Sequence, residues 1–208
     1  MKPELDHLAY AAPDLDTGMK TIEKLLGVAP VRGGQHQGLG THNALIGLGT
    51  GVYLEIIAPD PEQPTPTRPR PFGVDSVQEP HLASWIARTS ELYEIVESSR
   101  ASGYDPGEIR SLSRRRPDGT LVRWTMAIRD DPPGDGLVPP LIDWGDTPHP
   151  SADLPQGGMF VGLRGEHPLP DDIRQILRPL QVDLDVSAGP APMLIATIET
   201  AQGPIELR

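Results

Sequence analysis

The chain has 208 residues, of which 37% are hydrophobic and 23% are charged, so it can bury the core of one globular unit or of two small ones. Its 29 acidic and 18 basic side chains give a formal net charge of −11, which disfavours nucleic acid and anionic membrane surfaces as partners. The lack of cysteine excludes disulfides, thiolate nucleophiles and iron–sulfur clusters. Because Glu4 and Asp6 stand where a signal peptide has a basic start, we expect a cytoplasmic protein.

The first sixty residues have the pattern of a βαβββ module. Residues 5–12 are strand-like, and apolar residues at helical spacing predict a helix over 14–27, with Asp14 or Asp16 as its N-cap and Gly27 as its C-cap. A Gly-rich passage, which leaves room for one uncertain strand, precedes two strands at 41–48 and 52–58. We therefore expect a first module over residues 1–60.

A Pro-rich segment separates this module from a second one. The prolines between positions 59 and 80 disfavour helix and central strand, so residues 61–80 are expected to form an extended linker. The same order of elements then recurs over residues 81–145, with Ser90 as a plausible helix cap and a hairpin around Pro117 to Gly119. Residues 146–208 repeat the order more loosely, with a hairpin tip at Gln202 and Gly203, and are expected to pack on the same unit.

Several segments resemble the vicinal oxygen chelate superfamily (glyoxalases, bleomycin resistance proteins and dioxygenases), and more narrowly its glyoxalase-like domain branch. These segments are LDHLAYAAPDLD, GTHNALIGLG, VYLEIIAP and PPLIDWG. The resemblance implies an α+β fold in which paired βαβββ modules form a curved mixed sheet that encloses a cavity. It also implies a divalent metal held by residues on facing strands.

Carried onto this chain, the pattern of the superfamily assigns metal ligands to the first and last strands of a module, which are the positions of His7 and Glu55. Imidazole and carboxylate suit Zn, Fe, Ni or Mn, and Glu55 would double as a catalytic base. Strand alternation agrees, because His7 shares a face with Ala9, and Glu55 shares one with Tyr53.

The second module departs from this pattern. Ser84 takes the place of a histidine, whereas Asp143 falls near the place of Glu55. His42, which follows the flexible Gly-rich passage, is the first choice for a missing imidazole, ahead of His81.

Three further residues are candidates for substrate binding. Trp85 and Trp124 would wall a cavity, and Arg123 would meet an anionic substrate. The structural alternatives are that the tryptophans belong to the core, that Arg123 lies in solvent and that Glu55 pairs with an arginine. The arginines 114–116, next to a turn, are expected to lie in a solvated loop, and the alternative is that they contact an acidic ligand or partner. The loop histidines His36, His149 and His167 are expected to be exposed.

These observations favour a small-molecule-binding protein that acts as a metal-dependent lyase, isomerase or dioxygenase. The alternative is a metal-free binding or sequestering protein of the same superfamily, which Ser84 supports. A structural module that forms a homodimer through its strand edges is a third alternative. The Gly-rich motifs lack the spacing of a phosphate-binding loop, and no G-x-S-x-G motif occurs.

Overall fold

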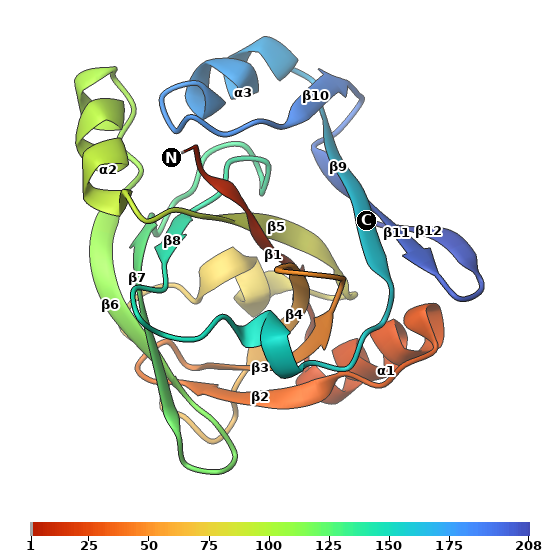
Figure 1. Cartoon of the computed structure of the whole chain (residues 1–208). Coiled ribbons are helices and arrows are strands. Elements are labelled where there is room, and N and C mark those ends of the chain that lie inside the picture. The colour runs from red at the N-terminus through yellow and green to blue at the C-terminus, as the bar shows by residue number, and fades with distance from the viewer. Residues whose placement is uncertain (1) are drawn as a thin grey trace.

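In the computed structural model, which describes residues 2–208, two βαβββ modules close into an eight-stranded barrel and a second, four-stranded sheet packs beside it (Figure 1). The first module comprises β1 (Glu4–Ala11), α1 (Leu15–Leu26), β2 (Val31–His36), β3 (Thr41–Gly47) and β4 (Tyr53–Pro59). The second comprises β5 (His81–Arg88), α2 (Leu92–Ala101), β6 (Glu108–Arg115), β7 (Leu121–Ile128) and β8 (Leu141–Asp143). The C-terminal extension comprises β9 (Met159–His167), α3 (Pro170–Leu177), β10 (Asp185–Ala188), β11 (Met193–Thr200) and β12 (Gly203–Leu207). The α+β fold with an enclosing curved sheet is therefore confirmed, and none of the helices in the described part of the chain is long and apolar enough to cross a membrane.

The barrel has the strand order β1-β4-β3-β2-β6-β7-β8-β5 and closes through β5 and β1. The two modules therefore meet at two seams. The seam between β1 and β5 is long and antiparallel and runs from Glu4 opposite Arg88 to Ala11 opposite His81. The seam between β2 and β6 is short and pairs Gln35 with Arg115 and His36 with Arg114. The four-stranded sheet of the extension has the order β10-β9-β11-β12.

Local signals account for the helix ends of the first module. Asp14 accepts a hydrogen bond from the backbone N–H of Thr17, and Gly27 ends α1 in the left-handed region at φ 72°. The expected cap at Ser90 is wrong, because Glu91 is the residue that precedes α2 and its N–H donates to the Thr89 hydroxyl.

The Pro-rich linker contains a short helical element that its proline content did not predict. The 3₁₀ element η1 (Pro71–Ser76) packs against β1, β4 and β5 and lies within the ring of strands in Figure 1. Phe72 adopts φ 58°, a conformation that a non-glycine residue rarely adopts. A second 3₁₀ element, η2 (Pro150–Asp153), lies in the connection from β8 to β9.

Strand alternation divides the hydrophobic residues between two faces of the barrel wall. Leu8, Leu54 and Ile56 face outward into the large core that also holds residues of all three helices and of the extension. Smaller groups face inward, one of them around Ala9 and Met126. Because the inward side chains do not fill the barrel, its interior has room for polar groups and a cavity.

Candidate functional site

The interior of the barrel holds His7 and Glu55, which lie on the adjacent parallel strands β1 and β4. The register sets His7 opposite Tyr53 and Ala9 opposite Glu55, and Nε2 of His7 lies 3.5 Å from Oε2 of Glu55. Both residues are buried, with exposed fractions of 4% and 6%. Strand alternation thus brings these side chains to one inward face, as the sequence predicted.

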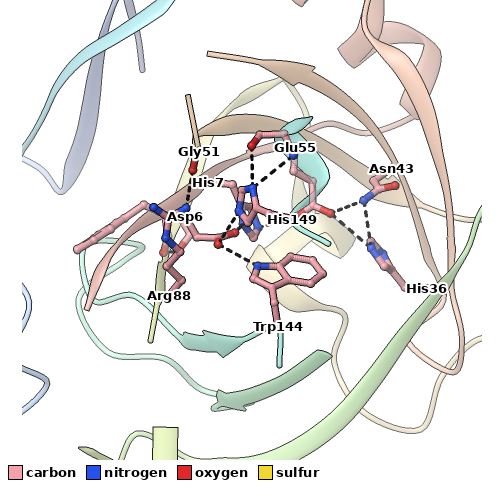
Figure 2. A network of polar contacts seen from close by, with 12 residues as sticks. Asp6, His7, His36, Asn43, Gly51, Glu55, Arg88, Trp144 and His149 are labelled. Atoms are coloured by element: carbon pink, nitrogen blue, oxygen red, sulfur yellow. Dashed lines mark hydrogen bonds and ion pairs between the residues drawn. The ribbon is translucent and has the colours of Figure 1, made fainter. Parts of the chain in front are cut away.

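Asp6 holds His7 from the other side of the imidazole ring. The pairing of β1 with β5 shifts its register between Leu5 and His7, and such a bulge redirects side chains that would otherwise alternate. The carboxylate of Asp6, which is 0% exposed, lies 2.5 Å from Nδ1 of His7. It also accepts a hydrogen bond of 2.9 Å from Nε1 of Trp144 and lies 2.9 Å from Nε2 of His149 (Figure 2).

The opposite end of the polar network is formed by His36 and Asn43 on β2 and β3. Oε1 of Glu55 accepts a 2.6 Å hydrogen bond from Nδ2 of Asn43 and lies 3.4 Å from Nε2 of His36. Nδ1 of His36 lies 2.9 Å from the hydroxyl oxygen of Thr41. Glu55 therefore lies between two imidazole rings, and Figure 2 shows this chain of contacts from His149 to His36.

Arg114 adds a buried cation to this end. The residue is only 4% exposed, and its Nη1 donates a 3.0 Å hydrogen bond to Oδ1 of Asn43. A glycine makes room for the pair, since a Cβ atom on Gly33 would lie 2.1 Å from Nη1 of Arg114 and 2.2 Å from Oδ1 of Asn43. The glycine at position 33 of β2 is thus required by the close approach of two polar side chains.

We expect Gly33→Ala to destabilise the protein by about 1–3 kcal/mol, because the added methyl group displaces the guanidinium of Arg114 from Asn43. The measurement is urea-induced unfolding of both proteins. Gly162→Ala is the matched control, because it also lies in a strand and no described atom lies within 4 Å of its added Cβ. An unchanged free energy of unfolding in Gly33→Ala would show that the side chains tolerate the methyl group.

The charges of the network stabilise one another. Burial alone would raise the pKa of Glu55, but hydrogen bonds with His36 and His7 hold it well below its usual value. Burial likewise opposes the charged form of His7, yet its hydrogen bonds with Asp6 and Glu55 raise the pKa to about 9. At neutral pH His7 is therefore an imidazolium between two carboxylates.

Two adjoining cavities lie beside this network. The inner chamber, of about 50 Å³, is lined by the network residues His7, His36, Asn43, Glu55 and Arg114 together with aromatic and apolar side chains that include Trp124. The outer chamber, of about 460 Å³, opens toward the Pro-rich segment. The residues that line both chambers are Leu39, Pro71, Phe72, Leu112 and Ile128. The junction is thus apolar, and η1 contributes two of its side chains.

Trp124, whose side chain lines the inner chamber, carries a hydrogen-bond donor without a partner. Its Nε1 atom is buried and has no hydrogen-bond partner among residues 2–208. The indole lies edge-on to the His36 ring at 6.0 Å and tilted against Trp144 at 5.6 Å. A buried N–H without an acceptor costs about 1–3 kcal/mol, which an acceptor atom of a ligand would recover.

The other residues singled out from the sequence lie elsewhere. His42 pairs with Ala58 on the outward face of β3 and lies 3.8 Å from Asp60, and Asp143 accepts a hydrogen bond from the N–H of Gly145. Trp85 belongs to the outer core, where its Nε1 donates to the carbonyl of Leu137. Arg123 is exposed and faces away from the chamber that its neighbour Trp124 lines.

Four expectations of exposure are wrong. His36 is 5% exposed, Arg114 is buried, His149 is half-buried against Asp6, and His167 is half-buried in β9. Strand parity offered a signal for β3, because the apolar residues Ala44 and Ile46 share a face with His42 and so leave Asn43 on the inward face.

These side chains do not fit the divalent metal that the resemblance implies. Among residues 2–208, no group of three or more His, Asp or Glu side chains has an arrangement that could hold a metal ion. The nitrogens of His7 already face Asp6 and Glu55. In the second module, Ser84 donates to backbone carbonyls in place of a histidine, and Asp143 accepts from the N–H of Gly145. The positive charge that balances Glu55 therefore comes from the chain itself.

Comparison with known proteins identifies relatives by sequence model and by structure. Residues 5–180 match the model of a family described as glyoxalase-like domain. A hypothetical protein from Staphylococcus aureus has a similar structure, with a TM-score of 0.66 at 13% identity over 99% of this chain and 84% of that one. No curated protein matches the chain significantly.

Two enzymes show weaker structural similarity. Methylmalonyl-CoA epimerase from Mycobacterium tuberculosis has a TM-score of 0.44 at 21% identity, over 68% of this chain and 87% of that one. A mutant 4-hydroxymandelate synthase from Streptomyces coelicolor has a TM-score of 0.48 at 11% identity, over 99% of this chain and 62% of that one.

Proposed function

Because the chain belongs to the glyoxalase-like domain family of the vicinal oxygen chelate superfamily, we propose that its barrel binds a small organic molecule in the inner and outer chambers. We further propose that it does so without a resident metal. The observation that carries this proposal is the buried, unpartnered Nε1 donor of Trp124, a residue that lines the inner chamber. A polar end and apolar walls are the usual composition of a small-molecule site.

The size of the chambers supports a ligand that spans both. A water molecule needs about 10–15 Å³ of such space, so an inner chamber of about 50 Å³ has room for a small functional group. The outer chamber, of about 460 Å³, has room for the body of the molecule. A ligand would pass the apolar junction at Phe72 and Leu112.

The charge state of Glu55 favours binding over proton abstraction by this residue. A general base works best when its pKa lies near the working pH. The pKa of Glu55 is held well below its usual value despite burial, because His36 and His7 stabilise the carboxylate. Such a carboxylate is a weak base at neutral pH, so its main effect is to orient the two imidazole rings.

We expect Leu112→Trp to abolish ligand binding, because the larger side chain fills the junction between the chambers. The measurement is ligand-observed NMR with a library of small organic acids, amides, alcohols and amines, on protein that elemental analysis shows to be free of metal. Ser113→Trp is the matched control, because the neighbouring residue has the opposite strand parity and lines neither chamber. Circular dichroism verifies that both variants are folded.

Two results would contradict this proposal. If no member of the library binds the wild-type protein, the barrel is not a small-molecule site. If binding appears only after addition of Zn, Fe, Ni or Mn and is lost in the His7→Ala, Glu55→Ala double variant, the metal-dependent alternative holds instead.

A further inference from the structure

We infer that the inner chamber recognises a carboxylate, held by the guanidinium of Arg114 and the indole N–H of Trp124, on a ligand whose apolar chain extends into the outer chamber. This inference rests on the proposed function and adds the chemical class of the ligand. Arg114 and Trp124 lie on the adjacent strands β6 and β7, where Trp124 is opposite Leu112, the inward neighbour of Arg114. Both line the inner chamber.

The hydrogen-bonding capacity of Arg114 is largely unused. A guanidinium carries five N–H donors in a planar fork that matches a carboxylate. Within residues 2–208, the guanidinium of Arg114 forms its hydrogen bond with Asn43 alone, through Nη1. Burial of the charge lowers its pKa, but an arginine remains protonated and therefore keeps its attraction for an anion.

The remaining polar atoms at this end favour an acceptor over a donor as the incoming group. Oε1 of Glu55 already accepts a hydrogen bond from Nδ2 of Asn43, and Oε2 of Glu55 lies 3.5 Å from Nε2 of His7. The unpartnered Nε1–H of Trp124 also requires an acceptor. A carboxylate offers two acceptor oxygens and the charge that complements Arg114, whereas an ammonium group would meet unfavourable donors on both side chains.

Arg114 also lines a surface groove of about 790 Å³ on its other side, together with Gly33 and Val122. Trp124 lines the inner chamber but not this groove. The contribution of Trp124 to binding therefore distinguishes a carboxylate in the inner chamber from an anion on the groove side of the guanidinium.

The experiment compares butyrate, hexanoate and octanoate with the primary amides of the same chain length, by titration of the full chain at neutral pH with NMR detection. We expect each acid to bind at least 10-fold more tightly than its amide, because a charge-assisted hydrogen bond is replaced by a neutral one. Affinity should rise about fourfold per methylene group as the chain enters the apolar junction. No variant is needed for this comparison.

Variants locate the carboxylate. We expect Arg114→Gln to weaken octanoate binding by about 10- to 100-fold and Trp124→Phe, which keeps an aromatic ring, by about 3- to 10-fold. Arg115→Gln is the matched control, because this arginine is exposed on the same strand and its removal changes the net charge equally. Its effect on affinity should be less than about twofold, since exposed charges are screened by solvent.

The outcomes separate this inference from the proposed function. Equal binding of acids and amides, or binding of other library members but of no carboxylate, overturns the inference and leaves the barrel as a small-molecule site. Loss of binding in Arg114→Gln with no effect of Trp124→Phe places the anion in the groove and overturns the inference as well. Failure of every compound to bind removes the proposed function itself.

Discussion

Asp6→Asn is expected to destabilise the protein by about 3–5 kcal/mol, because it removes the charged partner of a buried imidazolium. The carboxylate of Asp6 is fully buried and interacts with His7, His149 and Trp144 at once. An asparagine offers one acceptor oxygen in place of two and directs an N–H group at one of these partners. The loss should therefore exceed that of a single hydrogen bond.

The free energy of unfolding, from urea titrations at neutral pH, checks this prediction. Asp143→Asn is the matched control, since Asp143 is half-buried and accepts a hydrogen bond from the N–H of Gly145. We expect it to cost about 1 kcal/mol or less. Equal effects of the two substitutions would show that the buried network adds nothing beyond an ordinary hydrogen bond.

Deprotonation of His7 is expected to make the protein less stable at alkaline pH, by about 3 kcal/mol between about pH 6.5 and pH 9. Although burial opposes its charge, hydrogen bonds with Asp6 and Glu55 raise its pKa from 6.5 to about 9. A pKa that is raised in the folded state contributes stability that is complete below the pKa of the unfolded chain and is lost as the pH rises through the folded value. The window of loss is therefore pH 6.5 to 9.

Urea unfolding of wild type and His7→Gln across this window tests the assignment. The alkaline loss should vanish in His7→Gln and persist in His81→Gln, which replaces an exposed histidine. If His7→Gln loses as much stability at alkaline pH as the wild type does, the loss belongs to another titratable group. At acidic pH the stability changes with pH in the opposite direction. The lowered pKa values of Asp6 and Glu55 contribute stability that is lost as the pH falls below about 4.5.

Hydrophobic periodicity and turn residues were sufficient to predict the order of the elements. Alternation along β1 and β4 placed His7 and Glu55 on one face, and the Asp14 and Gly27 signals located α1. Two features escaped this reasoning because they depend on tertiary contacts. Phe72 and its neighbours form a 3₁₀ turn against the barrel strands, and Glu91, whose N–H donates to the Thr89 hydroxyl, takes the cap position expected for Ser90.

The site was predicted only in part, because departures from regular alternation create the rest of it. The bulge between Leu5 and His7 directs Asp6 into the network, and no composition signal marks a bulge at that position. Arg114 belongs to a run of arginines that is typical of a solvated loop. The register of the β6–β7 hairpin nevertheless directs its side chain into the barrel, where it is buried. His36 is buried for the same reason, since it pairs with Arg114 across the second seam.

The unequal lengths of the two seams determine how the barrel would respond to a force that separates the modules. The long β1–β5 seam would act as the fixed edge, and parting would begin at the short β2–β6 seam. His36 on β2 and Arg114 on β6 pair directly with each other across that short seam. If this seam widened, the guanidinium of Arg114 would move away from the imidazole of His36 and the carboxamide of Asn43 on the first module. The polar end of the cavity therefore forms only while β2 and β6 remain paired.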